Sequence, residues 1–469
     1  MAAPPRALIA KLIAVGSLLS LISFLYLYSG APFRSRLLSS LFPADTSRSG
    51  HGSTCTPEAW ADGRWNPKAN YAPLTSPNTT LRAPEDVFGF NGLQGCAADR
   101  EFKWHLGVDH EEQFDRFPGM TSWEWTPAKS CKGVRRLESE AFVRDLVEQG
   151  GWLVLGDSIS ENHFFSLSCT LFPHVRATPN YTENPYFDRA WPQNLYLNPS
   201  SPLVSTLKLP LNFSMEHTPL VTFRRVDLLL NRDELEALHR RKHPELYTNP
   251  EHPFQLFSEE QFWSLSPTEY MPLLTGQLPA SRYSTLIVAT AGHWTTTLLG
   301  GLRDEAAGED AGFGISNVLE FFGDAMREWA DAVQRALEVD QREQARRVMA
   351  ARLGGRGPET VDVVKRRVVV RAYLPGHEDC HNQHAPWQQW KPYQWKWYNW
   401  PWIGEMNGIF QKLLSGAAYP DVHFLPIDRP ALLRPDAHAS GDCLHIVTGT
   451  GVIEGWTQYI WHYVTRELA

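Results

Sequence analysis

The sequence lacks the features that mark proteins that bind nucleic acids, dinucleotides or zinc. Its 44 Lys and Arg residues are fewer than its 52 Asp and Glu residues, which gives a net charge of -8, and no basic cluster is interleaved with aromatic residues. None of the six cysteines forms a C-x-x-C pair, and Gly449 and Gly451 do not follow a predicted strand. We therefore expect no nucleic acid as a partner. Nor do we expect a metal site, a dithiol redox site or a dinucleotide-binding loop.

The composition is that of a folded protein with a large core. Of the 469 residues, 43% are hydrophobic and 12% are aromatic, which excludes disorder along the whole chain. Apolar segments predict strands at 221–230, 284–290, 367–373 and 422–427, and helices are predicted at 137–148 and 316–353. Strands that alternate with helices predict an α/β fold, a three-layer sandwich with a central, mainly parallel sheet. In such folds ligands bind at the C-terminal ends of the strands.

The only long apolar run near the N-terminus is 12–28, which follows Arg6 and Lys11. Its length is close to the minimum for crossing a membrane. A cleavable signal peptide is the alternative, but no small-x-small cleavage site follows the run. We therefore predict a cytosolic tail at 1–11, a transmembrane signal anchor at 12–28 and a stalk rich in Ser, Gly, Pro and Arg at 29–54.

Glycosylation sequons and cysteines indicate that the part after the anchor is lumenal. Asn78, Asn180 and Asn212 each begin an Asn-x-Ser/Thr sequon. The even number and wide spacing of the cysteines predict three disulfides, although six buried free thiols in a cytosolic protein are the alternative. These cysteines are Cys55, Cys96, Cys131, Cys169, Cys380 and Cys443. The predicted location is a Golgi or other secretory-pathway membrane, with single-pass type II topology.

The stretch 151–165, GGWLVLGDSISENHF, predicts a buried strand that turns into a helix and presents a serine. Gly156 permits a tight turn before Ser158. Ser158 and Glu161 fit a Ser-x-x-Glu capping box, so we expect a helix to begin at Ser158. Its free amide groups and positive dipole end would lie beside the serine hydroxyl, where they could stabilise an oxyanion.

A serine nucleophile needs a base and a group that orients the base. Asp442 and His445, at the far end of the chain, are spaced to supply both from one loop. Asp436 and His438 form a rival pair. The GDSISEN stretch and the D-C-L-H stretch together resemble the GDS and DxxH blocks of the SGNH (GDSL-like) hydrolases, and that resemblance favours Asp442 and His445 over the rival pair.

Further motifs make the resemblance more specific. W-E-W-T-P at 123–127, Cys131, S-L-S-C at 166–169, G-H-W at 292–294 and R-P-D-A-H at 434–438 are similar to blocks of the PC-esterase family. This is the family of the plant trichome-birefringence-like polysaccharide O-acetyltransferases.

The resemblance extends from about Cys55 to the C-terminus, so 55–469 is interpreted as one catalytic domain with an SGNH-like sandwich. Within it, 55–131 is interpreted as a disulfide-stapled cap packed over the sheet. The resemblance also implies that Cys380 and Cys443 are bonded, which would tie the loop of the aspartate and histidine to the sheet.

Two departures from the family pattern affect the expected site. The chain has Glu161 where plant members usually carry arginine, and 290–293 is Thr-Ala-Gly-His where they have Asn-Thr-Gly-His. Because the usual oxyanion-hole asparagine is missing, Asn162 is the expected substitute. Gly292 and His293 are assigned to the same oxyanion or substrate region. A hydrogen-bonded structural role is the alternative for His293.

A tryptophan-rich segment follows the third predicted strand. Its six tryptophans are Trp387, Trp390, Trp395, Trp397, Trp400 and Trp402. Because the segment has no helical or alternating period, it is either a core plug under the cap or an exposed platform on which sugar rings stack. We expect one or two of these indoles at the site, with Trp387 and Trp390 as the candidates.

The predicted function is transfer of acetyl groups to polysaccharide or glycan hydroxyls. Ser158 is the expected nucleophile, His445 the base and Asp442 the residue that orients it. No bound cofactor is expected, but an acetyl donor such as acetyl-CoA or an acetylated carrier is required as co-substrate, and a membrane protein could supply it. A carbohydrate O-acetylesterase with the same triad and a non-catalytic glycan-binding protein are the alternatives.

Overall fold

The computed structural model describes residues 55–468 except 70, 72–79, 179–191, 356, 358–359, 397 and 440–441. The predicted anchor at 12–28 and the sequons at Asn78 and Asn180 lie outside the described residues. Asn212, the third sequon, is exposed on the surface. Within this described part, no helix combines the length and the apolar composition that a membrane span requires.

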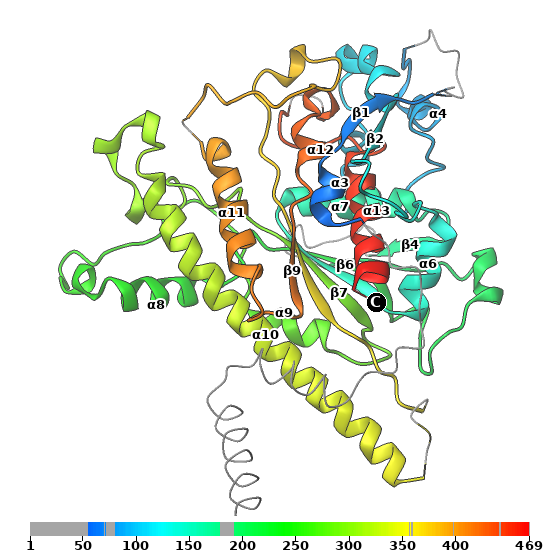
Figure 1. Ribbon diagram of the computed structural model, residues 1–469. Helices are drawn as coiled ribbons and strands as arrows, with labels where there is room; N and C mark the ends of the chain where they lie inside the picture. The colour runs from blue at the N-terminus through cyan, green and yellow to red at the C-terminus, as the bar shows by residue number, and fades with distance from the viewer. Residues whose placement is uncertain are drawn as a thin grey trace, which may run out of the picture.

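A seven-stranded, mainly parallel sheet forms the centre of the fold (Figure 1), which confirms the predicted mixed α/β class. The strand order is β4-β5-β6-β3-β7-β8-β9, and β5 is antiparallel to both of its neighbours. The strands are β3 (Gly151–Gly156), β4 (Val175–Thr178), β5 (Gln193–Leu197), β6 (Pro219–Arg225), β7 (Tyr283–Ala289), β8 (Arg367–Arg371) and β9 (Val422–Leu425).

Strand β3 lies in the middle of the sheet and pairs in parallel with β6 and β7. All six of its residues are buried, because helices cover both faces of a parallel sheet. The chain runs from β3 to β6 on one side and then crosses to β7 on the other. The C-terminal end of β3 therefore lies at the switch point of the sheet, where α/β folds place their ligands.

Two groups of helices cover the sheet. The first comprises α6 (Ser139–Glu148), α7 (Ser158–Thr170) and α13 (Val452–His462), and α6 and α7 pack on β3 and β6. The second comprises α9 (Pro267–Leu274), α10 (Ile315–Leu353) and α11 (Ile403–Leu414), of which α9 packs on β7 and α11 on β9. Right-handed crossovers in opposite directions from β3 place the groups on opposite faces. Figure 1 shows α10 and α11 to the left of the sheet and α6 and α13 to its right.

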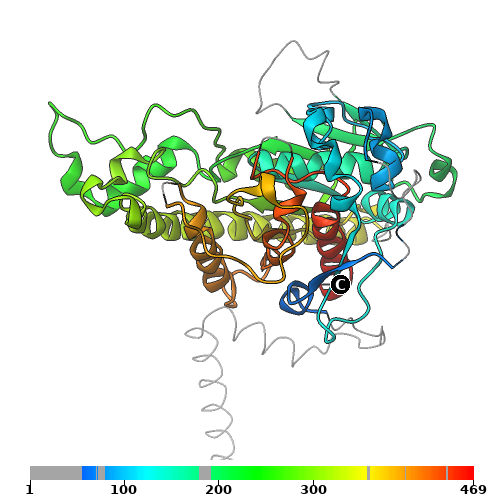
Figure 2. The ribbon, with the colours of Figure 1, turned by 90° about the horizontal axis from the view of Figure 1, so that it is seen from above.

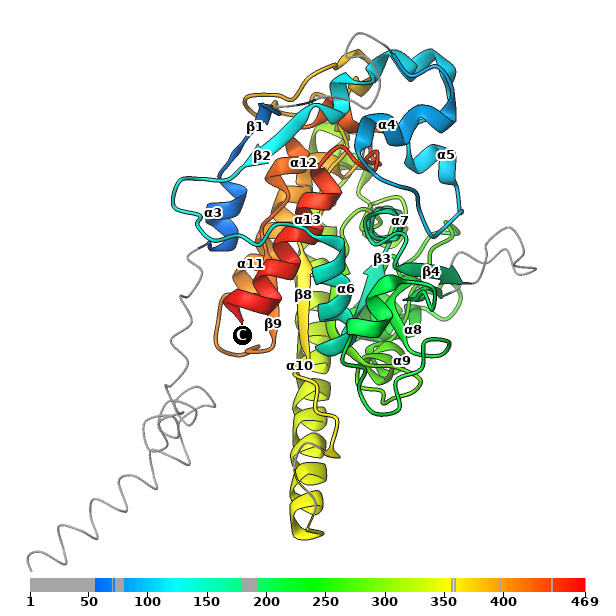
Figure 3. The ribbon, with the colours of Figure 1, turned by 90° about the vertical axis from the view of Figure 1, so that its right-hand side faces the viewer.

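Helix α10 is 39 residues long and extends beyond the body of the molecule (Figure 3). Its first half packs through buried residues such as Phe322 and Trp329. Met349 and Leu353, near its end, are 64% and 81% exposed. Because α10 leads into β8, this projecting end lies at the N-terminal edge of the sheet.

The cap, residues 55–131, contains the strands β1 (Arg64–Pro67) and β2 (Trp123–Thr126), which pair antiparallel. Its short helices are α3 (Pro57–Ala61), α4 (Val87–Asn91) and α5 (Phe102–His105). Figure 2 shows the cap beside α13, far from α8 (Arg232–Lys242). Hydrogen bonds join the cap to the C-terminal part of the chain, from Trp65 Nε1 to Pro430 O, Arg434 Nη2 to Met120 O, Thr448 N to His105 O and Tyr459 OH to Cys55 O. The cap therefore packs on α13 and on the loops that precede it.

The strands predicted at 221–230, 284–290, 367–373 and 422–427 correspond to β6, β7, β8 and β9, and the helices predicted at 137–148 and 316–353 correspond to α6 and α10. The predicted strand at 221–230 was too long, because the chain leaves the sheet after Arg225. The elements that were not predicted include β4, β5, α8, α9, α11 and α13. The long α10 was predicted because its apolar positions repeat over many turns.

Three disulfides are present, as the cysteine count predicted. They join Cys55 to Cys131, Cys96 to Cys169 and Cys380 to Cys443. The first joins the two ends of the cap, and the second joins the cap to α7. The third is the pair that the family resemblance implied.

Candidate active site

Ser158, His445 and Asp442 lie together at the C-terminal edge of the sheet. His445 Nε2 is 2.7 Å from Ser158 Oγ, and His445 Nδ1 is 2.6 Å from Asp442 Oδ2. Ser158 begins α7 directly after β3, whereas the other two residues lie in the loop before α13. The three side chains form one hydrogen-bonded chain, in which His445 is placed to take a proton from the serine hydroxyl.

Asp442 orients the histidine and also shapes the loop. Its Oδ1 accepts hydrogen bonds from the backbone amides of Leu444 and His445, at 2.7 and 3.0 Å. Burial alone would raise the pKa of Asp442, but the hydrogen bond and positive charge of His445, together with the two amides, hold this pKa well below its usual range. The carboxylate therefore stays ionised at neutral pH and fixes the N–H of the imidazole on Nδ1.

The start of α7 differs from the predicted capping box. The N-cap is Asp157, whose Oδ1 accepts from Ile159 N at 3.0 Å, and Ser158 is the first helical residue. Glu161 does not reach back to the N-cap, because its Oε1 lies 2.9 Å from both Arg100 Nε and Gln193 Nε2. Ser158 N makes no hydrogen bond to any described residue, so this amide and the dipole end of α7 lie beside the serine hydroxyl.

Asn162 holds the catalytic loop. Its Oδ1 accepts from Ile446 N at 2.9 Å, and its Nδ2 is 3.1 Å from His105 Nδ1. Burial, together with the positive charges that His445 and Arg100 can carry, lowers the pKa of His105 well below its ordinary value, so a neutral His105 accepts the Asn162 amide proton. The Asn162 side chain is therefore engaged on both sides, although the sequence had assigned it to an oxyanion.

Gly292 and His293 lie just after β7, beside the turn that follows β3. A side chain on residue 292 would clash with Tyr373, since a Cβ there would be 2.3 Å from the tyrosine oxygen and 3.2 Å from Asp157 Oδ2. Tyr373 OH donates to Asp157 Oδ2 at 2.6 Å. The Gly292 carbonyl accepts from Tyr398 OH and Asn399 Nδ2, each at 3.1 Å. Glycine is thus required for this close approach to the nucleophile turn.

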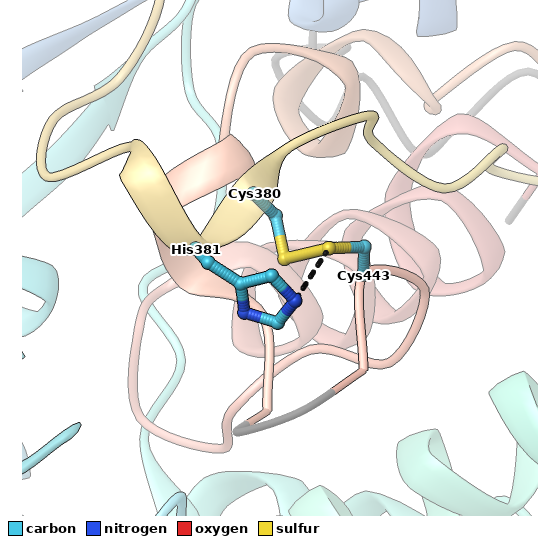
Figure 4. Close-up of side chains that lie close together, drawn as sticks. All are labelled: Cys380, His381 and Cys443. Atoms are coloured by element: carbon cyan, nitrogen blue, oxygen red, sulfur yellow. Dashed lines mark hydrogen bonds between the residues drawn. A yellow bond between two sulfur atoms is a disulfide. The ribbon is translucent and has the colours of Figure 1, made fainter. Parts of the chain in front are cut away.

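The disulfide between Cys380 and Cys443 anchors the catalytic loop one residue after Asp442. Cys443 O also accepts from His377 N at 2.8 Å. His381 lies beside the bridge, with Nε2 3.7 Å from Cys443 Sγ (Figure 4). Cys380, His381 and Cys443 are close enough together to be considered as metal ligands. The two cysteine sulfurs, however, are bonded to each other in the disulfide and are not free thiolates.

Asp436 and His438 do not form a second catalytic pair. Asp436 is buried and bonded to Arg434, with Oδ1 2.9 Å from Arg434 Nε. His438 Nδ1 donates to the carbonyl of His445 at 3.1 Å, and its Nε2 faces His377 Nδ1 at 2.5 Å. The rival pair is therefore part of the scaffold that holds the backbone of His445.

The candidate tryptophans lie in the segment that follows Cys380. Trp387 is half-buried, its ring packs edge-on against His377, and its Nε1 donates to Gln383 at 2.9 Å. Trp390 is 43% exposed and packs edge-on against Tyr393. Trp387 thus resembles a core plug and Trp390 a surface platform, while Trp397 lies outside the described residues.

Two cavities in the described part of the chain lie away from the triad. A cavity of about 830 Å³ follows the projecting end of α10, at the opposite edge of the sheet from Ser158, and is lined by residues such as Met349 and Leu353. A smaller one of about 190 Å³ lies beside Trp387 and Tyr393. The triad is therefore identified by its hydrogen bonds and not by cavity size.

Several residues near the C-terminal end of β3 were not predicted as part of the site. Trp104 in α5 packs edge-on against the imidazole of His445, with ring centroids 4.7 Å apart. Arg225, Asp227 and Trp263 form a cluster at the end of β6. In the sequence, Trp104 is marked only by the histidine beside it, which does not indicate a site. Arg225, Asp227 and Trp263 have no spacing that is typical of a known motif.

The sequence was compared with protein-family models and with curated proteins, and neither comparison gives a match.

Proposed function

We propose that this protein is an O-acetyltransferase that acetylates hydroxyl groups of a polysaccharide or glycan. The observation that carries the proposal is the hydrogen-bonded chain from Ser158 through His445 to Asp442, at the start of a helix. The PC-esterase resemblance supports the choice of acetyl groups and carbohydrate, and it supports an SGNH-like fold. The predicted anchor and sequons support a Golgi or secretory-pathway membrane location with the catalytic domain in the lumen.

The proposed reaction has two steps. Ser158 Oγ attacks the acetyl carbonyl of the donor while His445 Nε2 takes the serine proton; the bond to the donor's leaving group breaks, and His445 protonates that group. The acceptor hydroxyl then attacks acetyl-Ser158, gives its proton to His445, and the ester bond to Ser158 breaks as the proton returns to Oγ. Acetyl-CoA or an acetylated carrier supplies the acetyl group, and a donor-supplying membrane protein is a possible partner.

We assign two backbone amides to the oxyanion of each tetrahedral intermediate. The amide of Ser158 begins α7, and the amide of Gly292 lies on the neighbouring strand end; neither donates to a described residue. Preorganised donors of this kind account for a large share of acyl-transfer catalysis. Since Asn162 is engaged by Ile446 and His105, we assign it to holding the catalytic loop.

The test is to trap the covalent intermediate. The purified full chain is mixed with p-nitrophenyl acetate and analysed by intact and peptide mass spectrometry. One acetyl group on Ser158 is expected, and it should be absent in Ser158→Ala and His445→Ala. Discharge of the adduct onto added oligosaccharide supports the transferase. Rapid discharge into buffer without an acetylated product supports the esterase, which has the same triad. No adduct, together with glycan binding that survives Ser158→Ala, supports a non-catalytic glycan-binding protein.

A further inference from the structure

A second carboxylate and histidine pair spans the end of β3. Asp227 follows β6 and His293 follows β7, and β3 lies between these two strands. His293 Nε2 nevertheless lies 3.4 Å from Asp227 Oδ1. Neighbouring strands are about 4.8 Å apart, so the histidine reaches across the end of β3 to make this contact. That is where the chain turns to present Ser158.

The pair is rigidly held and leaves one ring nitrogen available. Asp227 is buried; its Oδ1 accepts from Arg225 Nε at 2.6 Å and its Oδ2 from Trp263 N at 2.9 Å. His293 Nε2 faces Asp227 and also Arg225 Nη2, at 3.4 Å. Nδ1 makes no hydrogen bond to any residue in the described part, and the side chain is 23% exposed. A hydroxyl ligand fits either tautomer, because it both donates and accepts.

The charges around the pair favour a neutral ligand. Burial disfavours the charge on Arg225, but Asp227, Asp157 and Glu161 outweigh burial and raise its pKa. Arg100 also pairs with Glu161 at 2.9 Å, and the charge of Asp157 also acts on Arg371, so the three carboxylates and three guanidiniums around the pair balance and leave no excess positive charge to attract a ligand carboxylate. Arg225 Cζ lies 5.0 Å from the centre of the Trp263 ring. Trp263 is half-buried, so part of its indole is accessible to the apolar face of a sugar ring.

We propose that His293, Asp227 and Trp263 form the acceptor subsite, which binds a neutral pyranose that carries two adjacent free hydroxyl groups. This inference rests on the proposed acetyl transfer. One hydroxyl attacks acetyl-Ser158 and gives its proton to His445. The neighbouring hydroxyl hydrogen bonds to His293 Nδ1, and the sugar ring packs against Trp263. His293 positions the acceptor and takes no part in forming the acetyl-enzyme.

The two half-reactions separate this role from that of the triad. In the full chain, acetyl-Ser158 formation from p-nitrophenyl acetate is measured first, and its discharge by xylotetraose, mannotetraose or tetragalacturonate is measured second. We expect His293→Ala to slow discharge by the better neutral acceptor about tenfold, the loss of one well-placed hydrogen bond. Acetyl-enzyme formation should change less than twofold. His293→Gln should restore part of the discharge rate, since its amide can still bond Asp227 and a hydroxyl.

A matched histidine and a modified acceptor complete the design. His217→Ala, which changes an exposed histidine just before β6 at the opposite edge of the sheet from Ser158, should change neither half-reaction. Once the acetylated hydroxyl is mapped, an acceptor that lacks the adjacent hydroxyl can be compared with the complete acceptor. The wild type should be discharged more slowly by the acceptor that lacks this hydroxyl, whereas His293→Ala should be discharged at the same rate by both. Equal slowing of both half-reactions by His293→Ala, no slowing of either, or faster discharge by tetragalacturonate would overturn the subsite.

A direct binding measurement keeps the subsite testable if no acetyl-enzyme forms. Binding of xylotetraose and mannotetraose to Ser158→Ala is measured by titration calorimetry, with and without His293→Ala or Trp263→Ala. About tenfold weaker binding in each double variant supports the subsite, even where the proposed acetyl transfer itself has failed. Unchanged binding overturns the subsite and leaves the triad proposal unaffected.

Discussion

The two oxygens of Asp442 have separable roles. Oδ1 accepts the backbone amides of Leu444 and His445, and Oδ2 accepts the imidazole N–H. Asp442→Asn retains one carbonyl oxygen for the loop but places an amide N–H₂ against Nδ1. We expect acetyl-enzyme formation to fall on the order of 10⁴-fold, as when the orienting aspartate of a serine hydrolase is lost. Circular dichroism should show that the fold is retained. A loss of less than tenfold would contradict the assigned role.

His163 makes stability depend on pH. It is fully buried in α7, with Nε2 2.9 Å from Thr457 Oγ1. Burial and the charge of Arg371 lower the pKa of His163 to about 3, whereas an unfolded histidine titrates near pH 6.5. Between these two pH values the unfolded chain binds up to one more proton than the folded chain. The free energy of unfolding therefore decreases by about 1.4 kcal/mol for each unit by which the pH is lowered.

His163→Gln removes this proton uptake. In urea unfolding of the full chain, the variant should lose about 2 kcal/mol less stability than the wild type between pH 6.5 and pH 5. The exposed His384→Gln is the control and should follow the wild type. Parallel pH profiles for His163→Gln and the wild type would show that this histidine is not held neutral in the fold.

The loop that carries Asp442 and His445 depends on its disulfide. Breaking it in Cys380→Ser/Cys443→Ser should lower the free energy of unfolding by about 2 to 5 kcal/mol. Acetyl-enzyme formation should fall further than the folded fraction does, because Cys443 adjoins Asp442. The rate is measured at a temperature where circular dichroism shows the variant to be folded.

The disulfide between Cys55 and Cys131 provides the matched control. The sequence separations of the two disulfides are 76 and 63 residues, so their loop-closure contributions to stability are similar. Cys55→Ser/Cys131→Ser should cost comparable stability but leave the rate per folded molecule unchanged, because neither residue adjoins the triad. Equal rate losses in the two double variants would mean that the Cys380 bridge acts only through global stability.

At the level of the whole molecule, the cap and the sheet domain should unfold together. Buried hydrogen bonds join them, including Trp65 Nε1 to Pro430 O and Arg116 Nη1 to His438 O, both at 2.8 Å. Hydrogen exchange of the full chain in increasing urea should therefore give the same midpoint for cap peptides and for β3. An earlier midpoint for the cap would show that it is a separate folding unit.

Local patterns predicted the parts of the site that lie within one short segment. The buried run of β3 ending at Ser158 and the spacing of Asp442 and His445 are such patterns, and the structure brings the three residues together. Trp104 and Asp227 were missed because their roles depend on contacts between segments far apart in the chain. The prediction that Ser158 is the N-cap of α7 was wrong. Asp157, the residue before it, is the N-cap, and its side chain accepts the hydrogen bond from the Ile159 amide.

Helix α7 also determines how motion affects the site. Ser158 and Asn162 are one turn apart on the same face of this helix, and Asn162 holds the loop of His445 through Ile446 N. If α7 tilts or shifts against the sheet, the nucleophile and the anchor of its base move as one rigid body. A shift of α7 would therefore carry the His445 loop along with Ser158, while the disulfide between Cys380 and Cys443 ties the same loop to the segment that follows β8.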